Sequence, residues 1–334
     1  MTHSTKIRKQ KRRVIRELNK RVRKLEKLKR KHYQQALEIT LPKVSLGDLR
    51  DRYRPTHQAL PQTLLQRTPK FVRMPIDRSR PLLLYGSDNG LLACRVHLNR
   101  PDLIDTLSKS IDNLPPLSDN CPLKGLQRSD YESRHYGVWG PYMLIPKYTR
   151  EHRRDGDMAD DFIDRNEELF HEMSALLGQL VPGVFRHFQR YPMPDGTSRP
   201  CGAWTTCVIN NGGENPDETK IHRDVKESRY GYSCVVSCGD FTGGAIILYD
   251  LGYILEMGPG DLLLFPDSLI HHSNEITHGV RKSLVAFTQE NMNDYWKRTY
   301  GMVLRRQVRK ETLKQKKKDE KLRKREEMLR SKTE

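Results

Sequence analysis

The sequence predicts an α+β fold, in which a β-sandwich or β-barrel packs against helices. Residues 160–190 carry apolar side chains at helical spacing, among them Phe162, Phe170, Met173 and Leu177. After about residue 200, short apolar runs alternate with glycine-rich turns, a pattern typical of a sandwich or barrel. A long helix followed by closely spaced strands indicates that the helix covers one face of the β-structure.

Composition divides the chain into four predicted segments. Residues 1–40 form a basic helical extension, residues 41–82 a proline-rich linker with short ordered pieces, residues 83–304 the folded domain and residues 305–334 a basic helical tail. The extension is predicted to be helical because apolar residues such as Val14 recur in steps of three and four.

Within the domain, each element follows from its local pattern. The run Pro81–Tyr85 predicts a strand and Asp102–Ile111 a short helix, whereas residues 115–157 are rich in Pro, Gly and charge and predict mostly loops. We expect Pro182 to end or bend the long helix of residues 160–190. The later strands are predicted at Ala203–Asn210, Tyr230–Ser237, Gly244–Tyr249, Gly252–Met257, Asp261–Phe265 and Lys282–Thr288.

The charge of the chain is concentrated at its ends. The formal net charge is +18, and the mean hydropathy is −0.77. Residues 1–32 hold 15 Lys and Arg against two acids, and residues 305–334 hold 14 against six. Such ends favour polyanions, so nucleic acid, in particular DNA, is the predicted partner, and the nucleus is the predicted location, with the cytoplasm as the alternative. Solvated helices or targeting signals would carry the same charge.

Other compartments and chemistries are disfavoured. No run approaches about 18 apolar residues, so we expect no membrane span. The basic N-terminal segment lacks an apolar signal core, so secretion is not expected. The six cysteines show no paired zinc spacing, which favours reduced thiols.

Two residues of the segment Ile221–Asp224 suit a metal. On a strand, His222 and Asp224 lie two positions apart and therefore point to the same face. An imidazole and a carboxylate make up two thirds of the facial triad that binds Fe(II) and leaves positions for a bidentate co-substrate and O₂. A surface strand with an ion pair that involves Arg223 or Lys226 would explain the same two residues, so a metal site also requires a third ligand elsewhere in the chain.

A third ligand and an anion-binding group are present downstream. A buried strand at Asp261–Phe265 leads to His271 and His272, and His272 lies 48 residues after Asp224, room for the chain to return to the metal. Arg281 and Ser283 share a face of the next strand. A guanidinium fork with a hydroxyl suits the distal carboxylate of 2-oxoglutarate.

These blocks resemble the double-stranded β-helix of Fe(II)/2-oxoglutarate oxygenases. Segments Phe241–Leu248, Gly258–Phe265 and Ser283–Thr288 look most like the TET/JBP branch, especially its single-domain fungal and algal type, and the resemblance covers about residues 200–300. It implies a jelly-roll or cupin-like core with packed N-terminal helices. It also implies a dioxygenase that uses Fe(II), 2-oxoglutarate and O₂ to hydroxylate a methyl group on a nucleic-acid base, with 5-methylcytosine in DNA as the expected target and DNA demethylation as the expected process.

Carried over by position, the iron ligands are His222, Asp224 and His272, and the co-substrate residues are Arg281 with Ser283 in support. His271 remains the alternative third ligand, because only one of two adjacent residues on a strand can face the metal. Arg281 lies nine residues from His272 and ten from His271, and both spacings fit.

The substrate is the more open question. Asn210 could hydrogen-bond a base edge and Trp204 could stack on a base, although a turn asparagine and a core tryptophan fit the sequence equally well. A nuclear protein hydroxylase or demethylase of the same superfamily is the first alternative function. The second is a non-catalytic nucleic-acid-binding module, against which the intact ligand set argues. An AlkB-type repair enzyme is disfavoured, because Phe287 stands six residues after Arg281, where that group has a second arginine.

Overall fold

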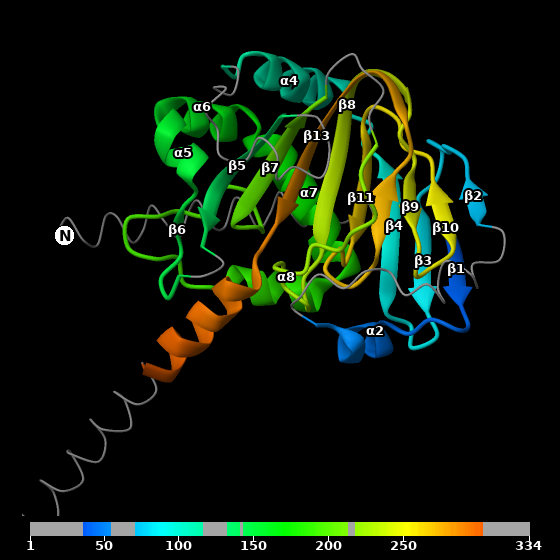
Figure 1. Ribbon diagram of the computed structural model, residues 1–334, viewed down its shortest axis with the longest axis horizontal. Helices are drawn as coiled ribbons and strands as arrows, with labels where there is room; N and C mark the ends of the chain where they lie inside the picture. The colour runs from blue at the N-terminus through cyan, green and yellow to red at the C-terminus, as the bar shows by residue number, and fades with distance from the viewer. Residues whose placement is uncertain (1–35, 55–70, 116–131, 141–142, 213–217, 303–334) are drawn as a thin grey trace, which may run out of the picture.

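Two β-sheets face each other, and helices cover the outer face of the larger sheet (Figure 1). The computed structural model describes residues 36–54, 71–115, 132–140, 143–212 and 218–302. The predicted basic helical extension of residues 1–40 lies outside the described residues as far as residue 35, and so does the predicted tail of residues 305–334. Within the described parts, no helix combines the length and apolarity that a bilayer crossing requires.

The larger sheet is almost wholly antiparallel, and only β1 and β3 run parallel. Its strands follow the order β1 (Leu37–Leu41), β3 (Leu82–Gly86), β4 (Leu91–His97), β11 (Asp261–Phe265), β8 (Ser233–Gly243), β13 (Thr277–Phe287), β7 (Thr206–Asn211), β5 (Glu132–Trp139) and β6 (Lys147–Tyr148). The smaller sheet follows the order β12 (His272–Asn274), β9 (Ile246–Leu248), β10 (Tyr253–Leu255) and β2 (Val72–Met74).

Strand alternation sends side chains into two separate cores. On β11, Leu262 and Leu264 pack toward the helices, whereas Leu263 and Phe265 pack toward the smaller sheet. Both faces of β11 are therefore covered, which explains its unbroken apolar run. On β13, Leu284 and Ala286 join the helix-side core, so the alternate residues of that strand face the smaller sheet.

The helices form where the pattern predicts them, but in shorter pieces. The predicted short helix is α4 (Pro101–Asp112). The predicted helix of residues 160–190 is divided into α6 (Asp157–Arg165), α7 (Glu167–Leu180) and α8 (Pro182–Gln189), preceded by α5 (Arg150–Asp155). Asn166 separates α6 from α7, because its side-chain amide donates to the carbonyl of Phe162 at 2.8 Å and ends α6. Pro182 begins α8, a position where its missing N–H costs nothing.

Two segments predicted to be irregular contain ordered elements. Residues 37–41 form β1 at the edge of the larger sheet, so the prediction of a helical extension as far as residue 40 is wrong at its end, and α2 (Leu46–Arg52) follows within the predicted linker. Pro42 lies between β1 and α2, outside both elements. The segment 115–157, predicted to be loops, contains β5, β6 and α5.

A buried ion cluster ties β5 to α5. Asp155 accepts hydrogen bonds from Arg134 at 3.0 Å, from the hydroxyl of Tyr136 at 2.7 Å and from Arg154 at 2.6 Å. The side chains of Arg134 and Asp155 are each only 4% exposed. Burial alone would raise the pKa of Asp155, but the hydrogen bonds and the two guanidinium charges outweigh it and lower the pKa.

Candidate metal centre

His222 and His272 are held opposite each other by their own backbones. The segment before β8 runs beside β12, and the two residues exchange both backbone hydrogen bonds, at 3.0 Å and 2.8 Å. An antiparallel pair of this kind puts both side chains on the same side of the strands. The two imidazole rings accordingly lie 4.3 Å apart between centroids.

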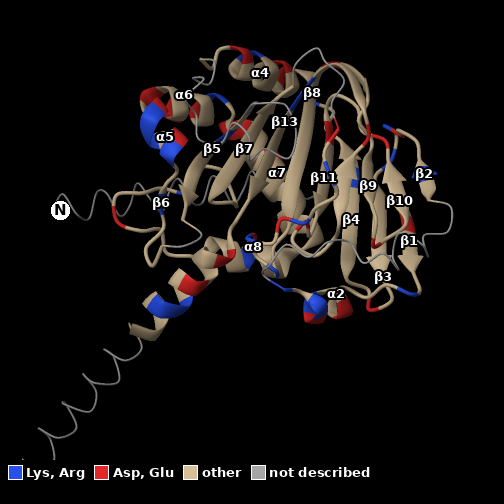
Figure 2. Cartoon of the chain, viewed as in Figure 1, with Lys and Arg blue, Asp and Glu red and all other residues tan. Residues whose placement is uncertain are grey.

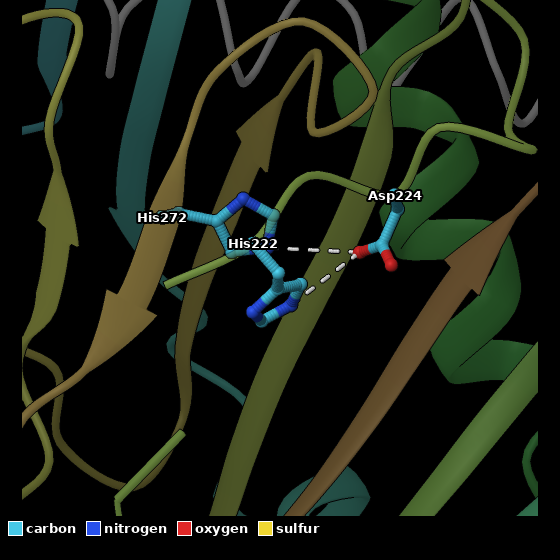
Figure 3. Close-up of side chains that lie close together, drawn as sticks. All are labelled: His222, Asp224 and His272. Atoms are coloured by element: carbon cyan, nitrogen blue, oxygen red, sulfur yellow. Dashed lines mark ion pairs between the residues drawn. The ribbon is translucent and has the colours of Figure 1, made fainter. Parts of the chain in front are cut away.

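The ring nitrogens of both histidines are oriented by main-chain carbonyls. Nδ1 of His222 donates to the carbonyl of Lys220 at 2.6 Å, and Nδ1 of His272 donates to that of Ile270 at 2.9 Å. With the proton on Nδ1, each Nε2 carries a lone pair, the form that ligates metals. These two nitrogens lie 3.9 Å and 3.6 Å from Oδ2 of Asp224 (Figure 3).

This donor set fits a metal ion of the Fe(II) type. The three ligand atoms all lie within 4.8 Å of one another. Two donors at right angles on an ion with bonds of about 2.1 Å would lie about 3 Å apart. The separations of 3.6 Å and 3.9 Å therefore need a contraction of less than about 1 Å. Two imidazoles and one carboxylate on one side of an ion leave positions for further ligands.

His271 lies away from this cluster. Its Nδ1 contacts a carboxylate oxygen of Asp250 at 3.0 Å, and its backbone N–H donates to the same oxygen at 2.6 Å. Adjacent residues point to opposite sides of an extended segment, so the hydrogen-bonded pairing of His272 with His222 directs His271 outward. Of the two histidines between which the sequence left the choice open, the geometry brings His272 to Asp224.

Arg281 and Ser283 lie on the same face of β13, toward the metal cluster. Arg281 donates to the hydroxyl of Ser237 at 3.2 Å, and its guanidinium lies 5.7 Å from the ring centre of Phe241. Gly244, at φ +65°, leaves room for the side chain of Arg281, because a Cβ at this position would lie 3.3 Å from Cδ of Arg281. Gly244 was predicted as the first residue of a strand, so its role beside Arg281 was missed.

Three neighbouring strands contribute a polar row beside Arg281. Asn210 on β7 donates to the hydroxyl of Ser283 at 3.1 Å and accepts from the hydroxyl of Ser133 on β5 at 2.8 Å. The register of β5, β7 and β13 puts these three residues side by side. Asn210 therefore lines the site and orients Ser283, and its contact with a base edge stays a prediction.

One cavity of about 360 Å³ is lined by the three residues of the metal cluster, by Arg281 and by the three residues of the polar row. Its wall combines the metal cluster and the polar row with aromatic and aliphatic side chains: His135, Trp139, Val208, Ile246, Phe265, Val285 and Phe287. His135 and Trp139 belong to β5, a strand that the sequence did not predict, and their place in the cavity was therefore missed. Trp204 does not line this cavity, because it is fully buried and donates its indole N–H to the carbonyl of Tyr232 at 2.7 Å. Its predicted stacking role is therefore corrected to a core role.

Two further carboxyl groups lie behind Asp224. Glu227 and Asp267 are buried, and their carboxyl oxygens lie within 4.8 Å of one of Asp224. Burial, and then the charge of Asp224, raises the pKa of Asp267 to about 7. Burial and the neighbouring carboxylates raise the pKa of Glu227 well above its ordinary value. The hydroxyl of Ser233 donates to a carboxyl oxygen of Glu227 at 2.6 Å, so the buried Glu227 side chain has a hydrogen-bond partner inside the protein.

Sequence comparison relates the chain to base-modifying dioxygenases. No protein-family model matches it. It is 26% identical over 147 residues to the bifunctional helicase and thymine dioxygenase JBP2 of Leishmania braziliensis, covering 42% of this chain and 13% of that protein. With JBP2 of Leishmania major it shares 26% identity over 165 residues, covering 47% and 14%. The chain therefore matches about one seventh of the length of these relatives.

Structural comparison relates the fold to a TET protein. The structure of NgTET1 in complex with 5mC DNA aligns with a TM-score of 0.50 and 15% identity, over 70% of this chain and 92% of that one. At this identity the likeness establishes the fold. The predicted double-stranded β-helix with packed helices is thus confirmed, as is the resemblance to the TET/JBP-like 2-oxoglutarate oxygenases.

Proposed function

We propose that this chain, which is TET/JBP-like in sequence and fold, is an Fe(II)- and 2-oxoglutarate-dependent dioxygenase that hydroxylates a methyl group on a nucleic-acid base. The observation that carries the proposal is one cavity that joins the His222, Asp224 and His272 cluster to Arg281. A metal cluster alone would fit many functions, but an arginine fork on the same wall supplies a place for a dicarboxylate co-substrate.

The residues have separate tasks. Nε2 of His222, Nε2 of His272 and the carboxylate of Asp224 would hold Fe(II), while the carbonyls of Lys220 and Ile270 keep both imidazoles in the binding tautomer. The chemistry that Fe(II) and 2-oxoglutarate supply, when bound, is activation of O₂ for hydroxylation of a C–H bond. Phe265, Val285 and Phe287 give the cavity an apolar part of its wall, where water finds no hydrogen-bond partner.

Replacing Arg281 with lysine is expected to raise the KM for 2-oxoglutarate by about 10-fold or more, because an ammonium group keeps the charge but loses the two-pronged geometry. Steady-state succinate formation measures this change, and Fe(II) affinity without 2-oxoglutarate should stay within about twofold. Arg80→Lys makes the same chemical change on the surface, where Arg80 is 49% exposed, and should leave the KM unchanged. An unchanged KM in Arg281→Lys would remove Arg281 from the co-substrate site.

We propose 5-methylcytosine in DNA as the target base. Its methyl group lies within the duplex, so the nucleotide has to leave the stack and enter the cavity. His135 and Trp139, whose rings lie 4.3 Å apart, form an aromatic wall for a planar ring. The basic segments 1–32 and 305–334 support attraction to phosphate, and a nuclear location follows as part of the proposal. The described domain mixes both charges, apart from a basic group on α5 (Figure 2).

Mass spectrometry of methylated DNA, methylated RNA and methylated histone peptides after incubation with the protein, Fe(II), 2-oxoglutarate and O₂ tests the substrate class. We expect an added oxygen on 5-methylcytosine in DNA, and none with Asp224→Ala. Oxygen on thymine instead would keep the enzyme class and change the base. Oxidation of peptides alone would overturn the nucleic-acid proposal.

A further inference from the structure

A second cavity lies between α2, α8 and the helix of residues 290–302, all at one end of the two sheets (Figure 1). We call it the α2–α8 groove. Its volume is about 670 Å³, within the range of about 300–1,000 Å³ that small-molecule sites occupy. Among the described residues, none lines both this groove and the metal cavity, so the groove is a separate site.

The walls of the groove are apolar and aromatic. Leu46 and Leu91 contribute on the sheet side and Leu180 and Val184 on the helix side, and the aromatic lining residues are Tyr85, His187, Tyr230, Tyr232 and Trp296. Planar rings with aliphatic neighbours suit a flat ligand, because every nucleobase has a π-face that stacks on such rings.

The polar groups of the groove are cations and hydrogen-bonding amides. Arg50 and Lys297 are its cationic side chains, and Asn89 and Asn293 carry its amides. Lys297 is partly neutralised by Asp294 at 3.6 Å, which leaves Arg50 as the main cation. No aspartate or glutamate belongs to the described lining, so the groove attracts anions.

The guanidinium of Arg50 contacts an aromatic ring, and one of its nitrogens has no hydrogen-bond acceptor among the described residues. The guanidinium lies 5.4 Å from the ring centre of Tyr230, and that ring also contacts the guanidinium of Arg229 at 4.7 Å. The Nε atom of Arg50 is buried and has no acceptor among the described residues. Because Nε is shielded from solvent, a phosphate in the groove would meet the guanidinium through its terminal nitrogens, whose planar fork suits two phosphate oxygens.

We propose that the α2–α8 groove binds a nucleoside monophosphate, with the phosphate at Arg50 and the base against the aromatic wall near Trp296. The amide of Asn89, on the turn between β3 and β4, offers both a donor and an acceptor to a base edge. The ligand is either a free nucleotide or one nucleotide of a strand. The proposal does not depend on the oxygenase function, because the groove shares no described residue with the metal centre.

Tryptophan fluorescence tests the proposal in the full chain, without Fe(II) or 2-oxoglutarate. The chain has three tryptophans, of which Trp139 lines the metal cavity and Trp204 is buried in the core. We expect dAMP to change the emission saturably, adenosine to bind at least 10-fold more weakly, and inorganic phosphate alone to leave the emission unchanged. Trp296→Phe should abolish the signal and Trp139→Phe should retain it. A signal that survives in Trp296→Phe but vanishes in Trp139→Phe would place the nucleotide in the metal cavity and overturn the proposal.

Matched variants test the role of Arg50. Arg50→Gln is expected to weaken dAMP binding at least 10-fold, whereas Arg52→Gln on the same helix, outside the groove, should not change it. Gly183→Leu gives a second test that does not touch the charge, because Gly183 lines the groove and a Cβ there meets no atom within 4 Å, so the larger side chain adds bulk to the lining without a clash. It should reduce dAMP binding without lowering the melting temperature. Unchanged binding in both Arg50→Gln and Gly183→Leu overturns the proposal. A groove that takes apolar ligands would bind the fatty acid laurate but not dAMP, and that result would overturn the proposal as well.

The source of the nucleotide is resolved by comparing dAMP with a four-residue deoxyadenosine strand. Tighter binding of the strand, with the same dependence on Trp296 and Arg50, assigns the groove to a nucleic-acid chain. Equal or weaker binding of the strand assigns it to free nucleotides. Both results retain the shared chemistry, and binding of neither probe rejects it.

Discussion

Replacing Asp224 with alanine is expected to abolish turnover and to weaken Fe(II) binding by more than about 100-fold. Asp224 supplies the one carboxylate of the proposed ligand set, and its loss leaves two neutral imidazoles. Changes to groups that merely orient a metal ligand already cost about 10- to 100-fold in affinity or activity, so removal of the ligand itself should cost more. Anaerobic titration of the protein with Fe(II) and 2-oxoglutarate measures binding, and succinate formation measures turnover.

The controls for Asp224→Ala come from the neighbouring His271 pair. Asp250→Ala removes a carboxylate that contacts His271 at 3.0 Å, and it should leave Fe(II) affinity within about threefold of the unchanged protein. His272→Ala and His271→Ala form a second matched pair, and only the first should lose iron. Equal Fe(II) binding by Asp224→Ala and the unchanged protein, or loss of iron in His271→Ala alone, would contradict the ligand assignment.

Loss of iron in Asp224→Ala should not be accompanied by loss of folding. Asp224 lies beside Glu227 and Asp267, and its charge raises the pKa of both. Removing a charge from a group of like charges relieves repulsion, so the free energy of unfolding without metal should stay unchanged or increase. Urea unfolding of both proteins checks this expectation and separates a ligand defect from a folding defect.

The metal ligands could be proposed from the sequence because their spacing is a local property. Two residues two apart on a strand share a face, so His222 and Asp224 suited a metal before any fold was known. In the structure His222 forms only an isolated bridge with His272, and Asp224 follows it in irregular backbone. The choice between His271 and His272 could not be made that way. It depends on which residue pairs with His222, and pairing between distant segments is a property of the tertiary fold.

The aromatic wall of the cavity was hidden for a related reason. His135 and Trp139 alternate with Arg134, Tyr136 and Val138 on β5, but the charge of Arg134 on the buried face obscured the apolar period. Arg134 is buried there because Asp155 neutralises its charge. The local sequence of β5 or of α5 does not indicate that these two residues form an ion pair. Strand prediction from hydrophobicity fails where a buried position is filled by an ion pair.

Replacing Asp155 with alanine is therefore expected to lower the free energy of unfolding by about 3–5 kcal/mol. The change leaves the guanidinium of Arg134 buried without its partner, and it also removes the acceptor of the Tyr136 hydroxyl. Urea unfolding measures the effect as a lower midpoint with an unchanged slope. Asp160→Ala is the control, because that side chain is 65% exposed and should change the stability by less than about 1 kcal/mol.

The pH dependence of this stabilisation has a definite sign. The folded-state pKa of Asp155 is lowered, so its contribution is fully present above the unfolded pKa of about 3.9 and is lost as the pH falls through the lower folded pKa. The difference in stability between the unchanged protein and Asp155→Ala should accordingly be constant from pH 5 to 7 and shrink below about pH 4. A difference that grows on acidification would contradict the ion-pair account.

The double variant Arg134→Met with Asp155→Leu should recover most of the stability that Asp155→Ala loses. Apolar side chains replace a buried ion pair at little cost, whereas an unpaired buried charge destabilises the fold.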